Sequence, residues 1–455
     1  MDSTPALHQN GDTYIPKDCA CVSSVAKNFS YYEPILFEDA QDGFVEHRVQ
    51  PINGPRCDPY CFPMHPQGDT FLDMNSIYMQ VTVSMTCSKS RAELLTWEAD
   101  NPSYCVSPAN NTLNALWSSI ECYLNDEPIG PASFYNAHYK SFIENVLSYD
   151  SKKNTHLGAT NFHFNDDIEK DKKFTDRDTA HFALRKMFHH EWTAELCGPV
   201  CVDFLRANNH LAPGNKLELR FNQTNDKFLW NSRKPEFAYR SSIKDISLYY
   251  RRIRMYPERF RSLFDYTKPQ IYCTSHTQVR LFPLTQNITH WDITLSTENA
   301  PLPKQIVVGF VSTKAQLGTY EKDGFYFEPF GINHIVLKKN GTRIPSEPLQ
   351  PNFTTKETSR SYYNLFMNTG RAKLNVGNTV SKKHFDSAGL TLFPLDLSND
   401  GSNGHHFQAG KNGKLELKLR WETPLTELVT CVVYFANDMI VKLPFSGGKP
   451  EIAIF

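Results

Sequence analysis

The chain reads G-N-K-L-E-L-R-F at Gly214–Phe221 and, about 200 residues later, N-G-K-L-E-L-K-L-R-W at Asn412–Trp421. In both segments a leucine or aromatic residue alternates with glutamate, lysine or arginine. Such a period of two is typical of an antiparallel strand with one buried face and one wet face. The buried face is expected to hold Leu217, Leu219 and Phe221 in the first copy, and Leu415, Leu417, Leu419 and Trp421 in the second.

The segments upstream of these strands are repeated as well. The run I-E-C-Y-L-N-D-E-P-I-G at Ile120–Gly130 is similar to H-I-V-L-K-K-N-G-T-R-I-P at His334–Pro345. Each holds a turn pair, Asn125-Asp126 in one and Asn340-Gly341 in the other, which predicts a hairpin. Residues at helical spacing follow each hairpin, namely Tyr135, Tyr139, Phe142, Val146 and Tyr149, and later Tyr362, Leu365 and Phe366. The order of hairpin, helix and strand occurs twice, which indicates an internal duplication.

The composition fits two β domains. The 455 residues are 40% hydrophobic, enough for two cores, and 28 Pro and 22 Gly separate many short strands. We therefore predict an all-β chain of two tandem jelly-roll β-sandwiches, a double jelly roll, with a short helix inserted in each. The expected divisions are an N-terminal arm at 1–30, a first jelly roll at 31–255, a linker at 256–270, a second jelly roll at 271–445 and a C-terminal tail at 446–455.

Charge and cysteine content exclude several classes of protein. The net charge is −1 at pH 7, so the chain as a whole is not a polycation adapted to nucleic acid. No signal peptide and no membrane-length apolar run are visible, and we expect a protein made in the cytosol that does not enter a membrane. The eleven cysteines are then expected to be reduced thiols.

No motif predicts an active site. His189-His190-Glu191-Trp192 lacks the second histidine of a zincin helix, because Ala194 stands at that position. Cys57, Cys61 and His65 have loose spacing for zinc, with Cys19 and Cys21 as further candidates, and neighbouring prolines favour a turn-rich loop. Cys197 and Cys201 are expected to be small core residues, and Asp166-Asp167 lies in a charged excursion at Ser151–Arg177. We expect no catalytic, cofactor-binding or metal-binding residues, no cofactor, and no enzymatic activity.

Three segments resemble a known family of proteins. They are L-W-S-S-I-E-C-Y-L-N-D-E-P-I at Leu116–Ile129, Y-K-S-F-I-E-N-V-L-S-Y at Tyr139–Tyr149 and I-K-D-I-S-L-Y-Y-R-R-I-R-M at Ile243–Met255. Together they resemble the first jelly roll of major capsid proteins, or hexons, of Polinton/Maverick elements and adintoviruses. The resemblance covers most of Phe71–Met255, and the internal duplication extends it to the second half of the chain.

This resemblance implies a structural role. A subunit of this family forms homotrimers that look hexagonal from above and tile an icosahedral shell around double-stranded DNA. It implies self-association into a capsid lattice, penton and minor capsid proteins as partners, and a location in the virion capsid. The protein would be made in the host cytoplasm and could be assembled in the nucleus.

Two questions stay open at the level of the sequence. The basic stretch from Arg240 to Arg261 is either an outward strand face or a contact with a neighbouring subunit or DNA phosphates. A two-domain glycan-binding protein or glycosidase is the alternative function, and it would need aromatic platforms and carboxylates in one groove.

We also expect the residues 1–30 and Ser446–Phe455 to act in assembly rather than in folding, since the tail ends in apolar I-A-I-F.

Overall fold

The computed structural model describes residues 41–54, 58–66, 68–88, 106–149, 160–161, 192–232, 235–263, 267–374, 376–398, 407, 410–444 and 448–455. The arm at 1–30, Cys19, Cys21, Cys57, Asp166-Asp167, His189–Glu191 and nearly all of the predicted excursion at Ser151–Arg177 lie outside these residues. Met1–Gln41 and Asp42–Phe455 form separate units, and the second unit contains both jelly rolls.

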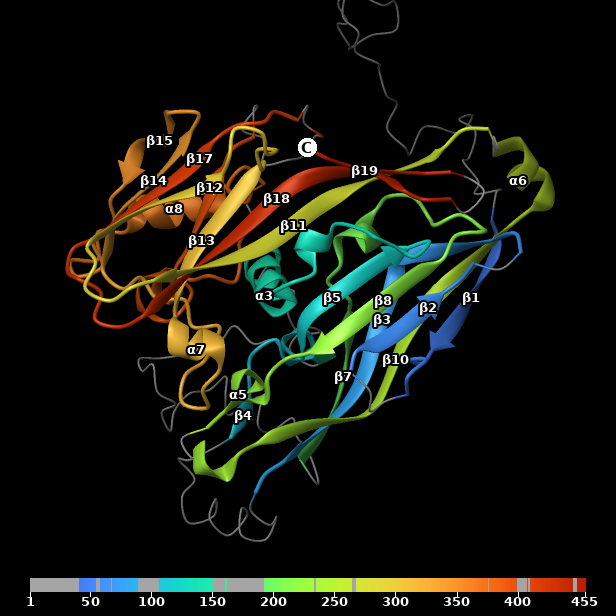
Figure 1. Ribbon diagram of the computed structural model, residues 1–455, viewed down its shortest axis with the longest axis horizontal. Coiled ribbons are helices and arrows are strands. Elements are labelled where there is room, and N and C mark those ends of the chain that lie inside the picture. The colour runs from blue at the N-terminus through green and yellow to red at the C-terminus, as the bar shows by residue number, and fades with distance from the viewer. Residues whose placement is uncertain are drawn as a thin grey trace, which may run out of the picture. The chain divides into compact units, whose positions relative to one another are not determined.

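The first half of the chain builds two four-stranded sheets (Figure 1). One has the order β1 (Gln41–Val49), β10 (Arg240–Met255), β3 (Thr70–Thr86) and β7 (Thr193–Pro199). The other has the order β2 (Tyr60–Met64), β8 (Leu217–Gln223), β5 (Trp117–Leu124) and β6 (Glu127–Pro128). A two-residue pair, β4 (Ser107–Pro108) with β9 (Trp230–Asn231), lies outside both sheets.

The second half repeats this arrangement. One sheet has the order β11 (Gln270–Leu284), β18 (Val429–Leu443), β13 (Gln305–Ser312) and β16 (Leu392–Asp396). The other has the order β12 (His290–Ser296), β17 (Leu415–Trp421), β14 (Ile332–Lys339) and β15 (Thr342–Leu349). In the first half β1 neighbours β10 and β2 neighbours β8, and in the second half β11 neighbours β18 and β12 neighbours β17. This pairing of early strands with late ones is the wrapping of a jelly roll. The predicted fold class is confirmed.

The two copies of K-L-E-L occupy equivalent strands. β8 lies between β2 and β5, and β17 lies between β12 and β14. Every residue assigned to the apolar faces of these two strands is buried, whereas Arg220 and Arg420 reach solvent. Equivalent neighbours on both sides of each copy support the duplication inferred from the sequence.

The two hairpin turns share one local geometry. Asn125 and Asp126 have φ values of 51° and 65°, and Asn340 and Gly341 have φ values of 49° and 86°. Two successive positive φ angles are the mark of the type I′ turn, which favours Asn and Gly. The first asparagine of each turn is hydrogen-bonded to the lysine of the K-L-E-L segment. Its Oδ1 accepts a bond from the N–H of Lys216 or Lys414 at 2.8 Å. In return, each asparagine N–H donates to the carbonyl of the same lysine at 2.9 Å.

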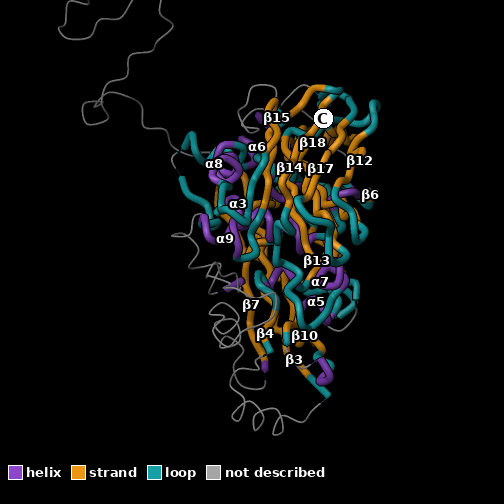
Figure 2. The backbone as a smooth tube through the Cα atoms, turned by 90° about the vertical axis from the view of Figure 1, so that its left-hand side faces the viewer, coloured by secondary structure: helices purple, strands orange, loops and turns teal. Residues whose placement is uncertain are grey.

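Helices interrupt the rolls at the predicted places. α3 (Ala137–Ser148) follows the first hairpin and α8 (Ser359–Met367) follows the second. Figure 2 shows both on one side of the strands, with α9 (Lys382–Ser387) beside them. The others are α2 (Thr112–Ala115), α5 (Asp226–Leu229), α6 (Pro257–Leu263), α7 (Thr313–Leu317) and the 3-10 turns η2 (Pro131–Ser133), η6 (Asp203–Arg206) and η7 (Pro235–Phe237). No helix within the described ranges is both long and apolar enough to cross a membrane.

Three segments carry structure that local patterns did not indicate. The expected linker contains α6, whose Phe260 packs with Phe71 and Ile253 in a small core. The tail, which we expected to act in assembly, contains β19 (Glu451–Ile454), which runs antiparallel to β18. Cys61, which we placed in a turn-rich loop, lies in β2 opposite Arg220, 159 residues further along the chain. Such a distant pairing partner is invisible to local patterns.

Candidate functional site

In the described part of the chain, a group of buried charged and hydrogen-bonding side chains lies around α3, where the two jelly rolls meet. Ten of the twelve residues of this helix are buried, and it lies between β5 of the first roll and β11 of the second (Figure 1). Phe142 stacks on Phe325, with ring centroids 4.4 Å apart and planes 8° from parallel. The Tyr139 hydroxyl donates to the Gly324 carbonyl at 3.0 Å. α3 therefore buries its two sides against two different sandwiches.

A buried ion pair of the first roll lies at this junction. Lys140 Nζ lies 2.8 Å from Asp203 Oδ1, and both side chains are only 3% exposed. Asp203 also accepts hydrogen bonds from the Thr277 N–H at 2.7 Å and from its hydroxyl. Burial lowers the pKa of Lys140, but the nearby Asp203 and Glu144 carboxylates outweigh burial, and the net shift is upward. The pair fixes helix α3 and turn η6 of the first roll to strand β11 of the second.

A second charged cluster lies one helical turn further along α3. The Arg206 guanidinium donates to Glu144 Oε2 at 2.6 Å, and the Cys201 thiol donates to the same oxygen at 3.1 Å. The Tyr434 hydroxyl, from β18 of the second roll, donates to Glu144 Oε1 at 3.2 Å. Burial opposes ionisation of Glu144, yet Arg206 and Lys140 hold the pKa of this carboxyl below its usual value.

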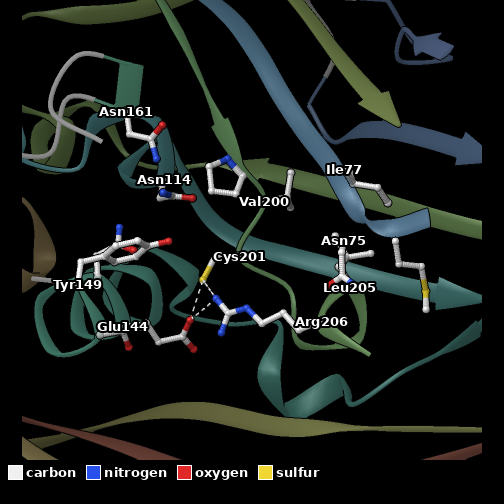
Figure 3. Close-up of a pocket in the computed structure, with 14 residues that line it drawn as sticks. Asn75, Ile77, Asn114, Glu144, Tyr149, Asn161, Val200, Cys201, Leu205 and Arg206 are labelled. Carbon is white, nitrogen blue, oxygen red and sulfur yellow. Dashed lines mark hydrogen bonds and ion pairs between the residues drawn. The ribbon is translucent and has the colours of Figure 1, made fainter. Parts of the chain in front are cut away.

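A pocket of about 240 Å³ opens beside this cluster (Figure 3). Its lining is mainly amide and apolar, and includes Asn75, Asn114, Asn145, Asn161, Ile77, Val200 and Leu205. Among the described residues that line it, Glu144 is the one carboxylate, and both of its oxygens are already engaged. Burial raises the pKa of Cys201 to about 12, so this thiol is not a nucleophile at neutral pH. This described lining lacks the pair of carboxylates that glycoside hydrolysis uses.

Sequence patterns did not identify this junction, although one signal was present. Lys140 and Glu144 stand four residues apart inside an otherwise apolar and aromatic helical pattern. Charged residues in that position are almost never fully buried unless they are paired. Their partners come from η6 and β18, which local patterns cannot connect to α3.

Of the sequence candidates for metal binding, the structure describes Cys61 and His65. Among the residues that the structure describes, no three His, Cys, Asp or Glu side chains are placed to hold a metal ion. Cys197 and Cys201 are both free thiols; Cys201 is buried, and Cys197 is partly exposed. The absence of metal-binding and catalytic residues stays a prediction.

The basic stretch lies mainly on β10, where several of its side chains point to solvent. Arg254 Nε pairs with Asp42 Oδ2 at 2.5 Å, and the Arg251 guanidinium lies 4.9 Å from the centre of the Phe44 ring. Lys244 donates to the Thr193 hydroxyl. Part of the positive charge is therefore compensated within the first roll, as expected for an outward strand face. The exposed members are Arg240, Lys244, Arg251, Arg254 and Arg259.

Comparison with known proteins begins with the sequence. No model of a known protein family matches it. An uncharacterized protein of Caenorhabditis elegans is 22% identical over 401 residues, which are 85% of this chain and 91% of that protein.

Solved structures are similar over nearly the whole chain. A chain of the Sputnik virophage has a TM-score of 0.62 at 12% identity, covering 97% of this chain and 94% of its own. A chain of the PBCV-1 virus capsid has a TM-score of 0.58 at 10% identity, covering 93% of this chain and 99% of its own. The mavirus major capsid protein has a TM-score of 0.51 at 10% identity, with 97% of each chain covered. These likenesses agree with the strand order in establishing a double jelly-roll fold.

Proposed function

We propose that the protein is a major capsid protein, the structural subunit of trimeric, pseudo-hexagonal capsomers in an icosahedral shell around double-stranded DNA. The observation that carries the proposal is the near full-length similarity, through both jelly rolls, to chains of viral capsids. The match to the mavirus major capsid protein covers 97% of each chain.

The duplication supports a trimer on geometric grounds. Two rolls with the same strand order give each chain two similar blocks. Three chains around a three-fold axis then supply six similar blocks, and such a ring can fill a hexagonal lattice. The buried Asp203 carboxylate suits this role, because it pairs with Lys140 of the first block and accepts hydrogen bonds from Thr277 of the second.

Further details of the proposal rest on the resemblance to Polinton/Maverick and adintovirus hexons. Penton and minor capsid proteins would be the other partners, and the virion capsid would be the location. Contact of the stretch from Arg240 to Arg261 with packaged DNA would be non-specific, since lysine and arginine attract phosphates without reading sequence. No catalytic activity is proposed.

The alternative, a glycan-binding protein or glycosidase, has less support. The described lining of the pocket beside α3 offers a single carboxylate, and that carboxylate is engaged by Arg206 and Tyr434. A glycosidase would need a second carboxyl group facing the first across the substrate.

Electron microscopy of the purified full-length protein tests the proposal. We expect class averages of three-fold particles with a hexagonal outline, and closed shells under assembly conditions. Single sandwich-like particles under every condition, together with binding to a glycan array, would favour the alternative instead.

A further inference from the structure

The duplicated helices differ in one respect, which is how much of each is covered. α3 has ten of its twelve residues buried, whereas α8 has only Ser361 and Leu365 buried among nine. The outer side of α3 is covered by the second roll, through Tyr434 and the loop that holds Phe325. The helix α8 packs on β16 of its own roll, and the rest of it reaches solvent, with Tyr363 60% exposed.

The sheets show the complementary difference. The strands β11 and β18 pair in the second roll, and β18 is buried on both faces from Val429 to Met439. The helix α3 packs on β11 and accepts a hydrogen bond from Tyr434 of β18. The equivalent strands of the first roll are β1 and β10. Their outer face is open, with Phe44 61% exposed and Arg251 beside it also exposed.

The open face carries side chains that suit a protein contact. The Tyr78 and Tyr249 rings stack with centroids 5.0 Å apart, and the Arg251 guanidinium lies over Phe44. Aromatic residues and arginine are the types enriched at the energetic centres of protein interfaces. An exposed cluster of this kind marks an interaction surface rather than a random apolar residue.

We propose that α8 of one copy docks on the outer face of β1 and β10 of a second copy. This contact repeats between chains the contact that α3 makes with β11 and β18 inside each chain. The occupant is a second copy of this chain because the equivalent surface of the second roll is covered by the equivalent helix of the first. The inference rests on the proposed function and assigns its subunit interface.

The proposed contact is head-to-tail, since the surfaces on α8 and on β1 are different. Heterologous contacts of this kind close into a ring when the rotation per subunit permits it. Around such a ring, the contact between the two rolls of one chain alternates with the proposed contact between chains. Three chains then contribute six rolls. Each chain in the ring would then have both its α8 and its β1 covered.

Two single substitutions and a matched control test the interface. Tyr363→Glu places a charge on α8, and Phe44→Glu places one on β1. Leu317→Glu is the control, since Leu317 is 67% exposed on α7 and lies outside both surfaces. Light scattering after size exclusion should give trimers of about 157 kDa for the wild type and the control, three times the 52.2 kDa chain. Each of the other two variants should be a folded monomer, and the two monomers should melt at the same temperature, since both lose the same stabilisation by association.

Mixing the two monomeric variants tests the direction of the contact. The Tyr363→Glu chain keeps an intact β1 face, and the Phe44→Glu chain keeps an intact α8. One sound interface can form between them, so a complex of two chains at about 104 kDa is expected, twice the 52.2 kDa chain. A mixture that stays at the mass of one chain at every concentration contradicts a head-to-tail contact.

The modes of failure are distinguishable. A wild-type protein that is monomeric overturns the proposed function. Trimeric wild type with trimeric Tyr363→Glu or Phe44→Glu overturns the interface alone. A Phe44→Glu monomer that melts more than about 4 °C below the Tyr363→Glu monomer, roughly 1 kcal/mol or more for domains of this size, shows that the face is covered within its own chain, which also overturns the interface.

Discussion

Replacing Asp203 with alanine should destabilise the junction between the two rolls more than most single changes. Its carboxylate accepts bonds from Lys140 Nζ at 2.8 Å and from the Thr277 N–H at 2.7 Å, at a site where both charged side chains are 3% exposed. Removing it leaves the Lys140 ammonium buried without its main counter-charge, which costs about 3–5 kcal/mol. The Thr277 N–H also loses its acceptor, which adds about 1–3 kcal/mol.

Urea unfolding followed by circular dichroism measures this loss as a change in the free energy of unfolding. A double variant, Lys140→Met with Asp203→Leu, is the matched control, because replacing both members of a buried pair with apolar residues of similar volume is often neutral. The double variant should recover most of the stability lost by Asp203→Ala. A loss below about 1 kcal/mol for Asp203→Ala would refute the reasoning, since a solvated surface pair contributes no more than that.

Four further predictions concern stability. Leu217→Ala and Leu417→Ala should each cost about 2–5 kcal/mol in chemical denaturation, and a loss below about 0.5 kcal/mol would mean that the buried faces are misassigned. Burial raises the pKa of Asp323 to about 6, so its carboxylate destabilises the folded state at pH 7, and this cost disappears as the pH falls below 3.8. Asp323→Asn, which keeps an acceptor for the Phe325 N–H, should therefore raise stability at pH 7 by up to about 3 kcal/mol and change little near pH 3; an equal gain at both pH values would exclude this cause. Deleting Gly448–Phe455 should lower the melting temperature, because β19 pairs with β18; an unchanged transition would restore the expectation that the tail acts only in assembly. A chelator should leave the melting temperature unchanged, and a fall of several degrees with zinc recovered in stoichiometric amount would reveal a structural metal.

Local sequence patterns predicted much of the fold because the duplication doubles each signal. The alternation in the two K-L-E-L strands identifies the buried faces, and the Asn125-Asp126 and Asn340-Gly341 pairs identify type I′ hairpins. The helical spacing after each hairpin also identified α3 and α8. These features are determined within a dozen residues of chain, where propensity and periodicity act directly.

Contacts between distant segments determine the features that local patterns could not predict. The Lys140–Asp203 pair joins positions 63 residues apart, and its third member, Thr277, lies in the other roll. The exposure of α8 indicates an interface only when it is compared with the burial of α3. That comparison needs the structure, because it depends on the equivalence of the two rolls in space.

The mass of the native protein tests the central claim most directly. Native mass spectrometry of the purified wild-type chain should show a trimer of about 157 kDa, three times 52.2 kDa, that persists on dilution. A single species of 52.2 kDa at every concentration would contradict the account of a capsomer subunit.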